Sequence, residues 1–341
     1  MDHQPNISRI NRRLSVAPMM DWTDRHCRFL HRLLSRQTLL YTEMITAKAI
    51  IHGDRDRLLG FDAFEHPIAL QVGGSDPADL AAAVRIACDH GYDEVNLNVG
   101  CPSDRVQSGT FGAVLMQQPN LVAECVSEMI AASIGAEITV KCRIGVDEQE
   151  PAQVLPEFLE TVSDAGVESF AIHARKAWLQ GLSPKQNRDV PPLNYGLVKE
   201  MKKSFPALEI AINGGIETLD QAQAFLADGL DGVMVGRAAY HHPFSVLAQA
   251  DNRVFGTDYS ISMPAVVHQM LPYIENHLRA GGRLNQISRH MLGLFAGRPG
   301  ARHWRRVLSN KAHIAGAGPE VVLEALRAVQ SVEEMNDTEV A

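Results

Sequence analysis

Short apolar segments recur along most of the chain, and each is followed by turn residues and then by a helix-like pattern. Between them lie stretches such as residues 76–91 and 151–166, which begin at an Asp or a Pro and end at a Gly, as helices commonly do. The eight apolar segments are residues 14–20, 39–44, 68–74, 94–100, 137–145, 169–175, 208–215 and 232–238.

Eight strand–helix units in succession predict an α/β fold, a (β/α)8 TIM barrel, for which about 250 residues is typical. A doubly wound open sheet is the alternative, and it would place a glycine-rich dinucleotide-binding turn after its first strand. The first segment instead continues as Ala-Pro-Met-Met-Asp-Trp-Thr-Asp, without a glycine. This favours the barrel, which we expect to occupy residues 1–250.

The pattern changes after about Asp251, where strand-like alternation ends. Residues 263–282, 284–297 and 318–332 have helical patterns, and the first two stretches end in glycine. Residues 251–341 therefore predict a small C-terminal helical domain. Its acidic last residues, Glu-Glu-Met-Asn-Asp-Thr-Glu-Val-Ala, are expected to fray.

Composition narrows the class of protein. With 45% hydrophobic and 21% charged residues, the 341-residue chain is typical of a globular protein. The formal net charge of -8 argues against a general polyanion binder but allows a local basic patch. No apolar run reaches the ~18–20 residues that a membrane span needs, and the N-terminus lacks the apolar part of a secretory signal. We expect a cytoplasmic protein without a membrane partner, and a monomer.

The cysteines and histidines do not predict a metal or disulfide protein. Five cysteines are scattered along the chain and never form a Cys-x-x-Cys pair, which argues against a disulfide framework and against structural zinc. The pair His241 and His242 lacks a third ligand and a His-Glu-x-x-His motif. We therefore expect no metal.

Polar side chains gather where five predicted strands end, which is where the chemistry of a TIM barrel collects. One such group is compatible with a satisfied core residue, but five strands with polar ends predict one site. Because side chains alternate along a strand, Lys141 and Arg143 share a face and Cys142 points the other way. The polar residues are Gln71, then Asn96, Asn98 and Cys101, then Lys141 and Arg143, then His173 and Arg175, and finally Asn213.

The loops after strands seven and eight are the usual phosphate site of such barrels, and here they contain Asn213-Gly214-Gly215 and Gly236-Arg237. Glycine lets backbone N–H groups approach a phosphate, and Arg237 can bind one with two parallel hydrogen bonds. A nearby Lys141 favours a flavin, because a fixed cation stabilises the negative charge of its reduced form. Gln71 could then bind the ring edge, and His173 could bind either the ring edge or the phosphate. Since no Gly-x-Gly-x-x-Gly unit occurs, a nicotinamide donor would dock only transiently.

A second signal is basic. Between Arg279 and Lys311 eight Lys and Arg residues follow one another without an Asp or Glu, a pattern suited to a nucleic-acid backbone. Arg302 and Arg305 are three residues apart and share a helix face. Lys176, Lys185 and Arg188, in the loop after strand six, could extend the patch, and Trp178 in the same loop could either stack on a base or pack.

Several long motifs resemble tRNA-dihydrouridine synthases, specifically the dihydrouridine synthase A branch. The resemblance covers residues 14–310 and is most specific in His-Ala-Arg-Lys-Ala-Trp-Leu-Gln-Gly-Leu-Ser-Pro-Lys-Gln-Asn-Arg and in residues 289–306. It implies an FMN enzyme that uses NADPH to reduce the 5,6 double bond of uridine in the tRNA D-loop, at positions 20 and 20a. By the family's pattern the FMN ligands fall on Pro18, Met19, Met20, Gln71, Lys141, His173, Asn213, Gly214, Gly215, Gly236 and Arg237.

The same resemblance places the catalytic cysteine on Cys101. Hydride addition at C6 of uracil requires a proton at C5, and a thiol that is protonated at neutral pH can donate it. Gly100 and Pro102 would fix the loop, and Asn98 could read the uracil edge, because an amide both donates and accepts. A uridine inside the folded D-loop must leave its stack to react. The predicted tRNA-binding residues are Asn98, Lys185, Arg188, Arg302 and Arg305.

Two other functions remain open at this stage. A flavin-dependent oxidoreductase of free pyrimidines, of the dihydroorotate dehydrogenase type, would share the barrel chemistry but gives the basic helices no role. A non-redox phosphate-binding barrel that binds tRNA leaves Lys141 and Cys101 unexplained.

Overall fold

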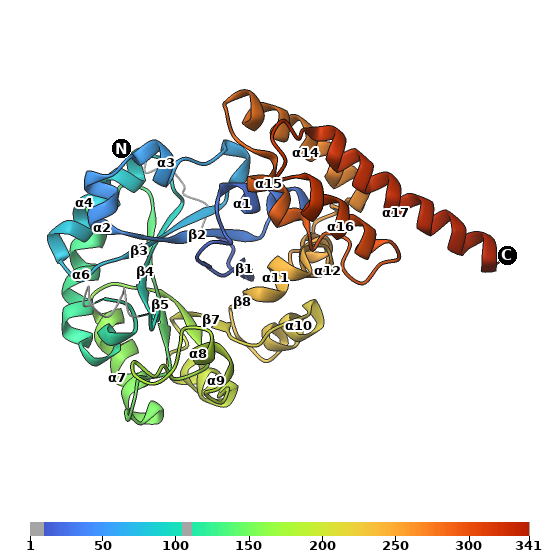
Figure 1. The fold of residues 1–341 in the computed structure, drawn as a ribbon. Helices are drawn as coiled ribbons and strands as arrows, with labels where there is room; N and C mark the ends of the chain where they lie inside the picture. The colour runs from blue at the N-terminus through green and yellow to red at the C-terminus, as the bar shows by residue number, and fades with distance from the viewer. Residues whose placement is uncertain (1–9, 104–110, 341) are drawn as a thin grey trace, which may run out of the picture. The chain divides into compact units, whose positions relative to one another are not determined.

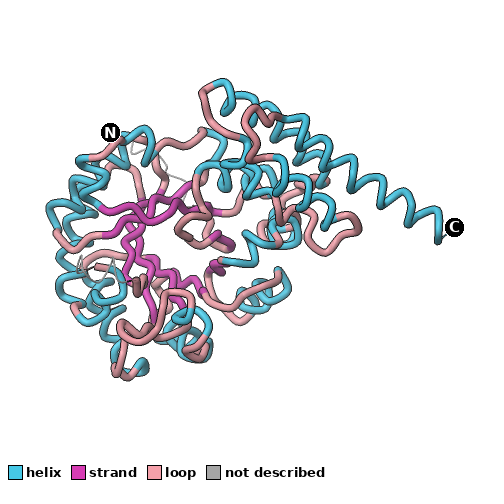
Figure 2. The backbone as a smooth tube through the Cα atoms, in the orientation of Figure 1, coloured by secondary structure: helices cyan, strands magenta, loops and turns pink. Residues whose placement is uncertain are grey.

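A closed barrel of parallel strands forms the first part of the chain, so the predicted TIM-barrel class is confirmed (Figure 1, Figure 2). The computed structural model describes the backbone of residues 10–103 and 111–340 and the side chains up to residue 330. The strands follow chain order around the barrel: β1 (Leu14–Val16), β2 (Leu39–Thr46), β3 (Ile68–Gly73), β4 (Glu94–Val99), β5 (Glu137–Arg143), β6 (Ser169–His173), β7 (Glu209–Asn213) and β8 (Gly232–Val235).

Helices connect successive strands and cover the barrel. Asp76 caps α4 by accepting the N–H of Asp79, and Pro77 occupies its first turn, where the missing N–H costs nothing. The helices of this part are α2 (Ala47–His52), α3 (Arg55–Leu59), α4 (Pro77–Asp89), α6 (Pro119–Ala132), α7 (Pro151–Asp164), α8 (Gln186–Asp189), α9 (Tyr195–Ser204) and α10 (Leu219–Ala227), with 3-10 turns η1 (Ala63–Glu65) and η2 (Gly112–Gln117).

The barrel interior contains both apolar and polar side chains. Small side chains such as Ala69, Ala171 and Ala211 pack there with Tyr41 and Met234. Strand β4 differs, because Glu94, Asn96 and Asn98 alternate on one face and all three are buried. Polar side chains therefore occur along the whole length of β4 and are not confined to the strand ends.

A second compact unit contains residues 22–38, 217–219 and 237–340. In it α1 (Arg25–Leu34), which precedes β2 in the chain, packs against α12, α14 and α15. Its other helices are α11 (Arg237–His241), α12 (Pro243–Leu247), α13 (Ala250–Arg253), α14 (Met263–Arg279), α15 (Leu284–Met291), α16 (Ala301–Lys311) and α17 (Pro319–Val340).

Two aspartates hold α1 within this unit. Asp24 accepts the N–H groups of His26 and Cys27 as the N-cap of α1, and it pairs with Arg289 of α15 at 2.6 Å. At the other end of the helix, Asp251 is buried and accepts hydrogen bonds from residues 35–37. The helix is therefore fixed at both ends to residues from the last third of the chain.

Among the described residues, no helix combines the length and apolar character needed to cross a membrane.

Candidate active site at the carboxyl end of the barrel

The loop that carries Cys101 is held by the side chain of Asn98. Its Oδ1 accepts the N–H of Gly100 at 3.0 Å and the N–H of Cys101 at 2.9 Å. The thiol itself is partly exposed, and its Sγ lies 3.5 Å from Oγ of Ser103. The cysteine backbone is thus fixed directly beyond β4, while its side chain stays accessible.

Arg143 holds the same loop from the neighbouring strand. Its Nε donates to the carbonyl oxygen of Gly100 at 2.9 Å, and its Nη1 donates to the carbonyl oxygens of Lys176 and Asn187 at 3.1 and 3.0 Å. The residue is only 3% exposed. A buried guanidinium must be satisfied by hydrogen bonds, and here three carbonyls from two loops do so. Arg143 therefore ties the Cys101 loop to the loop after β6.

Asn187 organises that second loop. It is fully buried, its Oδ1 accepts the N–H of Trp178 at 2.7 Å, and its Nδ2 donates to the carbonyl oxygens of Trp178 and Leu182. Lys176 lies with its Nζ 5.2 Å from the centre of the Trp178 ring, a cation–π contact. Asn187 binds the backbone of Trp178, whereas Lys176 lies over one face of its ring, and the side chain is half-buried.

Lys141 brings a poorly compensated cation to the site. Its Nζ donates to Oδ1 of Asn213 at 3.1 Å, and no carboxylate pairs with it among the described residues. Burial, together with repulsion from Arg143, lowers the pKa of Lys141 to about 8. Asn213 is fixed in turn, because its Nδ2 donates to the carbonyl oxygen of Met234 at 2.7 Å. An anionic group next to Lys141 would restore its preference for the charged form.

His173 lies against the glycine turn after β7. A Cβ atom at Gly214 would come within 2.6 Å of Cδ2 of His173, and one at Gly215 within 2.7 Å of Leu193. Both glycines also have positive φ, of 113° and 64°. The turn therefore requires glycine for its own packing, whether or not a phosphate binds there. Burial and the cations around it lower the pKa of His173, so the ring is neutral at pH 7.

The predicted cofactor ligands Gln71, Lys141, His173 and Asn213 lie at or within two residues of the carboxyl ends of β3, β5, β6 and β7, all in the first unit. Residues Asn98 and Lys141 pair across β4 and β5, and His173 pairs with Asn213 across β6 and β7. Among the other predicted ligands, Pro18 to Met20 follow β1, with Met20 55% exposed, and Gly236 follows β8. Arg237 begins α11 and belongs to the second unit.

The structure narrows the predicted role of Asn98. Its Oδ1 already accepts two backbone hydrogen bonds, and its Nδ2 donates to Oε1 of Gln71 at 2.8 Å. An amide oxygen has two lone pairs, so only the second hydrogen of Nδ2 remains for a base.

The basic residues lie in both units and most are exposed. In α16 the side chains of Trp304 and Leu308 are buried, while Arg302 and Arg305 are exposed and have no ion-pair partner among the described side chains. Two members of the basic run are compensated, because Arg289 pairs with Asp24 and Lys311 pairs with Glu324. Lys185 and Arg188 are exposed in and beside α8.

No group of three or more His, Cys, Asp or Glu in the described part of the chain could hold a metal ion.

Sequence analysis missed Glu94 and Thr139, of which Thr139 contacts Asn96 directly and Glu94 contacts Thr139, both inside the barrel. Oγ1 of Thr139 donates to Glu94 at 2.6 Å and accepts from Asn96 at 2.8 Å. The signal was present in the sequence as polar residues at every second position: Glu94, Asn96 and Asn98 in one strand, and Glu137, Thr139, Lys141 and Arg143 in the next.

The comparison with known families identifies the family to which the chain belongs. Residues 15–331 match the family model described as dihydrouridine synthase. The chain belongs to the dihydrouridine synthase family. This confirms the resemblance that the motifs predicted.

Members of this family are similar to the chain over nearly its whole length. A tRNA-dihydrouridine(20/20a) synthase of Shewanella oneidensis is 57% identical over 323 residues, which cover 94% of this chain and 95% of that protein. The protein of the same name from Escherichia coli K12 is 56% identical over 319 residues, covering 93% and 91%. That of a Synechocystis strain is 57% identical over 316 residues, covering 92% and 94%. These identities support the dihydrouridine synthase A branch within the family.

Solved structures with a similar fold are distant in sequence. An old yellow enzyme homologue from Zymomonas mobilis superposes with a TM-score of 0.52 at 15% identity, covering 73% of this chain and 90% of that one. Morphinone reductase gives a TM-score of 0.51 at 14% identity, covering 74% and 88%. These two likenesses concern the barrel fold alone.

Proposed function

We propose that the protein is an FMN-dependent tRNA-dihydrouridine synthase that reduces the C5–C6 double bond of uridines 20 and 20a in the tRNA D-loop with NADPH. The observation that carries this proposal is the fixed Cys101 loop, which Asn98 and Arg143 hold at the strand ends that also carry Lys141. The names of relatives that are 56–57% identical support the substrate and the positions.

The residues present fit a flavin. Lys141 is a partly buried cation whose only described partner is an amide, and burial together with nearby Arg143 lowers its pKa, so a bound anionic group would stabilise its charged form. Bound FMN would supply the hydride for C6 of the uracil and would take it from NADPH. Gln71, Lys141, His173 and Asn213 would hold the ring system, Pro18 to Met20 would flank it, and Gly214, Gly215, Gly236 and Arg237 would hold the phosphate.

The chain's own residues account for the proton. Hydride addition at C6 leaves negative charge on C5 and O4 of the base, and the Cys101 thiol donates a proton to C5. The S–H bond breaks as the new C–H bond forms, and the thiolate regains a proton from solvent. One NADPH and one proton are consumed for each uridine reduced. Because Asn98 and Arg143 fix the backbone on both sides of the Gly100–Cys101 peptide bond, the thiol is held in position before the substrate arrives.

The exposed arginines suit a tRNA substrate. Arg302 and Arg305 lie on the exposed face of α16 without carboxylate partners in the described part of the structure, so their charge is available to phosphates. Lys185 and Arg188 would contribute further backbone contacts, and Asn98 a single donated hydrogen bond to the base. A monomer in the cytoplasm, where tRNA and NADPH are both found, is the simplest setting.

A purified-component assay tests the proposal. The protein is incubated with NADPH and unmodified tRNA, and dihydrouridine is mapped at each D-loop position. The same protein is tested with free uridine and orotate. We expect a flavin absorbance spectrum, dihydrouridine at positions 20 and 20a, and no reduction of the free pyrimidines. Reduction of free pyrimidines but not of tRNA would favour the dihydroorotate dehydrogenase type of enzyme instead.

A further inference from the structure

A continuous line of hydrogen-bonded side chains runs through the barrel from the amino-terminal ends of the strands to the Cys101 loop. It starts at Glu94, the first residue of β4, and ends at Asn98, about 13 Å along the strand at about 3.3 Å per residue. Three side chains from adjacent strands join the two: Thr139 of β5, Asn96 of β4 and Gln71 of β3.

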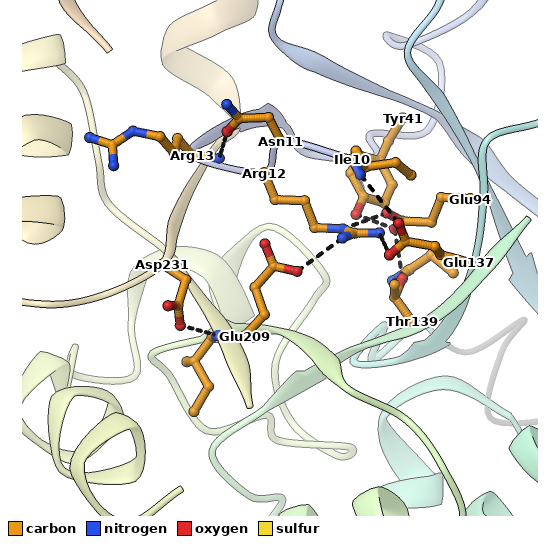
Figure 3. A network of polar contacts seen from close by, with 12 residues as sticks. Ile10, Asn11, Arg12, Arg13, Tyr41, Glu94, Glu137, Thr139, Glu209 and Asp231 are labelled. Carbon is orange, nitrogen blue, oxygen red and sulfur yellow. Dashed lines mark hydrogen bonds and ion pairs between the residues drawn. The ribbon is translucent and has the colours of Figure 1, made fainter. Parts of the chain in front are cut away.

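At its Glu94 end the line begins in an ion-pair cluster around Arg12 (Figure 3). Nε of Arg12 lies 2.8 Å from Oε2 of Glu94, and its two terminal nitrogens contact Glu137 at 2.7 Å and Glu209 at 2.9 Å. Glu94 is fully buried and Arg12 is 4% exposed. Burial by itself would lower the pKa of Arg12, but attraction to Glu94 and the other anions raises it above its ordinary value. Arg12 can only donate, so Glu94 is its acceptor, and the carboxylate of such an ion pair can only accept hydrogen bonds.

Because Glu94 accepts only, the groups beside it must donate. Its Oε1 accepts the hydroxyl hydrogens of Tyr41 and Thr139, and burial together with Glu94 raises the pKa of Tyr41, which keeps that hydrogen in place. Thr139 has one hydrogen and spends it on Glu94, so towards Asn96 it can only accept. Nδ2 of Asn96 therefore faces Thr139, at 2.8 Å.

The same reasoning continues upward through the amides. With its nitrogen on Thr139, Asn96 presents Oδ1 to Nε2 of Gln71, at 2.9 Å. Gln71 then presents Oε1 to Nδ2 of Asn98, at 2.8 Å. This leaves the oxygen of Asn98 for the N–H groups of Gly100 and Cys101, which can only donate. The Glu94 carboxylate, which only accepts, and the N–H groups of Gly100 and Cys101, which only donate, therefore favour the same orientation of all three amides. Each amide on its own could exchange the positions of its oxygen and nitrogen.

We propose that Glu94, Thr139 and Asn96 are positioning residues for Cys101, acting through Gln71 and Asn98 to keep an oxygen under the Gly100–Cys101 peptide. The line transmits orientation and not protons, because amides do not exchange them along a chain. A reversed amide anywhere in it would turn the nitrogen of Asn98 towards two N–H groups and release the loop. That these residues position a catalytic acid rests on the proposed function. That they hold the Gly100–Cys101 loop in place does not depend on it.

Hydrogen exchange of the Gly100 and Cys101 amides in the purified full-length protein tests this directly, together with the rate at which iodoacetamide alkylates Cys101. Thr139→Val keeps the shape of the side chain but removes its hydrogen bonds, and Glu94→Gln replaces the accept-only group with an amide. Thr139→Ser restores the hydroxyl. Glu137→Gln is the matched control, because it also removes a carboxylate from Arg12, while the described side-chain hydrogen bonds of Glu137 are with Arg12 and Ile10 and not with the line.

We expect Thr139→Val and Glu94→Gln to speed exchange of both amides about tenfold, the effect of losing one hydrogen bond, and to lower kcat on tRNA more than they change KM. Thr139→Ser and Glu137→Gln should exchange like the wild type. Unchanged exchange in the first two variants would overturn the proposal, and so would equal acceleration in all four, which would indicate general loosening of the barrel. A wild-type protein that leaves tRNA unreduced would instead refute the proposed function, and the exchange result would be unaffected.

Discussion

Nζ of Lys141 lies 3.1 Å from Oδ1 of Asn213, and this amide is the single described partner of a cation at the barrel's carboxyl end. In most proteins a buried lysine is matched by a carboxylate. Here burial, followed by repulsion from Arg143, lowers the pKa of Lys141 from 10.5 to about 8. The folded protein without a ligand therefore holds this proton less tightly than the unfolded chain does.

The first prediction concerns alkaline stability. Because the unfolded chain binds the Lys141 proton more tightly, the lysine destabilises the flavin-free protein below about pH 8, and this cost disappears as the pH approaches 10.5. The free energy of unfolding of the flavin-free protein should rise between these values relative to Lys141→Met, as measured by urea titration at several pH values. With FMN bound the relative rise should shrink. Parallel pH profiles for the two flavin-free proteins would contradict the prediction.

The second prediction concerns the thiol. Cys101→Ala should bind flavin and oxidise NADPH like the wild type but reduce uridine in tRNA ~10²–10⁴-fold more slowly, the usual cost of losing a positioned acid. Stopped-flow flavin reduction and single-turnover reduction of tRNA separate the two steps. Cys142→Ala is the matched control, because Cys142 is fully buried on the opposite face of β5. Wild-type turnover of tRNA by Cys101→Ala would remove the assignment.

The third prediction concerns tRNA binding. Changing Arg302 and Arg305 together to Glu should weaken tRNA binding and flatten its dependence on salt, because each lost phosphate contact reduces the log–log slope by about 0.7 to 0.9. Flavin content and NADPH oxidation should not change. The control reverses two exposed charges on the outer helices of the barrel, Arg85→Glu with Lys203→Glu. An unchanged slope for the α16 variant would place the tRNA contacts elsewhere.

The fourth prediction concerns the second unit. Asp251 is 1% exposed and accepts hydrogen bonds from the hydroxyl of Ser35 and from the N–H groups of Arg36 and Gln37. Asp251→Ala leaves these donors unsatisfied and should lower the free energy of unfolding by about 2–4 kcal/mol. The exposed Asp258 provides the control, for which alanine should cost less than about 0.5 kcal/mol. Chemical denaturation measures both.

Much of the barrel could be predicted from the sequence, because buried strands leave apolar runs that turns interrupt. The predicted segments begin within a residue of the observed strands, and all except residues 39–44, which stop two residues short of the end of β2, run past the carboxyl ends of their strands. Residues 14–20, for example, contain β1 only as Leu14–Val16. Beyond Val16 the chain stays apolar, since Ala17 is buried although it is outside the strand. In this segment burial continues for one residue beyond the strand, and the apolar residues after it, such as the 55% exposed Met20, are apolar without being buried.

The polar groups of the site were predicted by type and position but not by partner. Sequence indicates that Asn98 and Arg143 lie at strand ends, and it cannot show that both bind the backbone beside Cys101. Those contacts depend on the register between β4 and β5, where Asn98 pairs with Lys141. Arg12 was missed for a similar reason, because an arginine in a polar N-terminal segment gives no sign that three glutamates from distant strands surround it.

The placement of α1 in the second unit has a consequence for how the chain matures. The helix leaves the ribosome before β2, yet it packs against α12, α14 and α15, which are made only after residue 242. Throughout synthesis of the barrel, buried residues such as Leu30 and Leu34 must wait for the helices that will cover them. Deleting the last hundred residues would therefore leave a helix between β1 and β2 whose apolar face is uncovered. The C-terminal helices are therefore needed to cover α1. The packing of this first helix can be completed only after those helices have been synthesised.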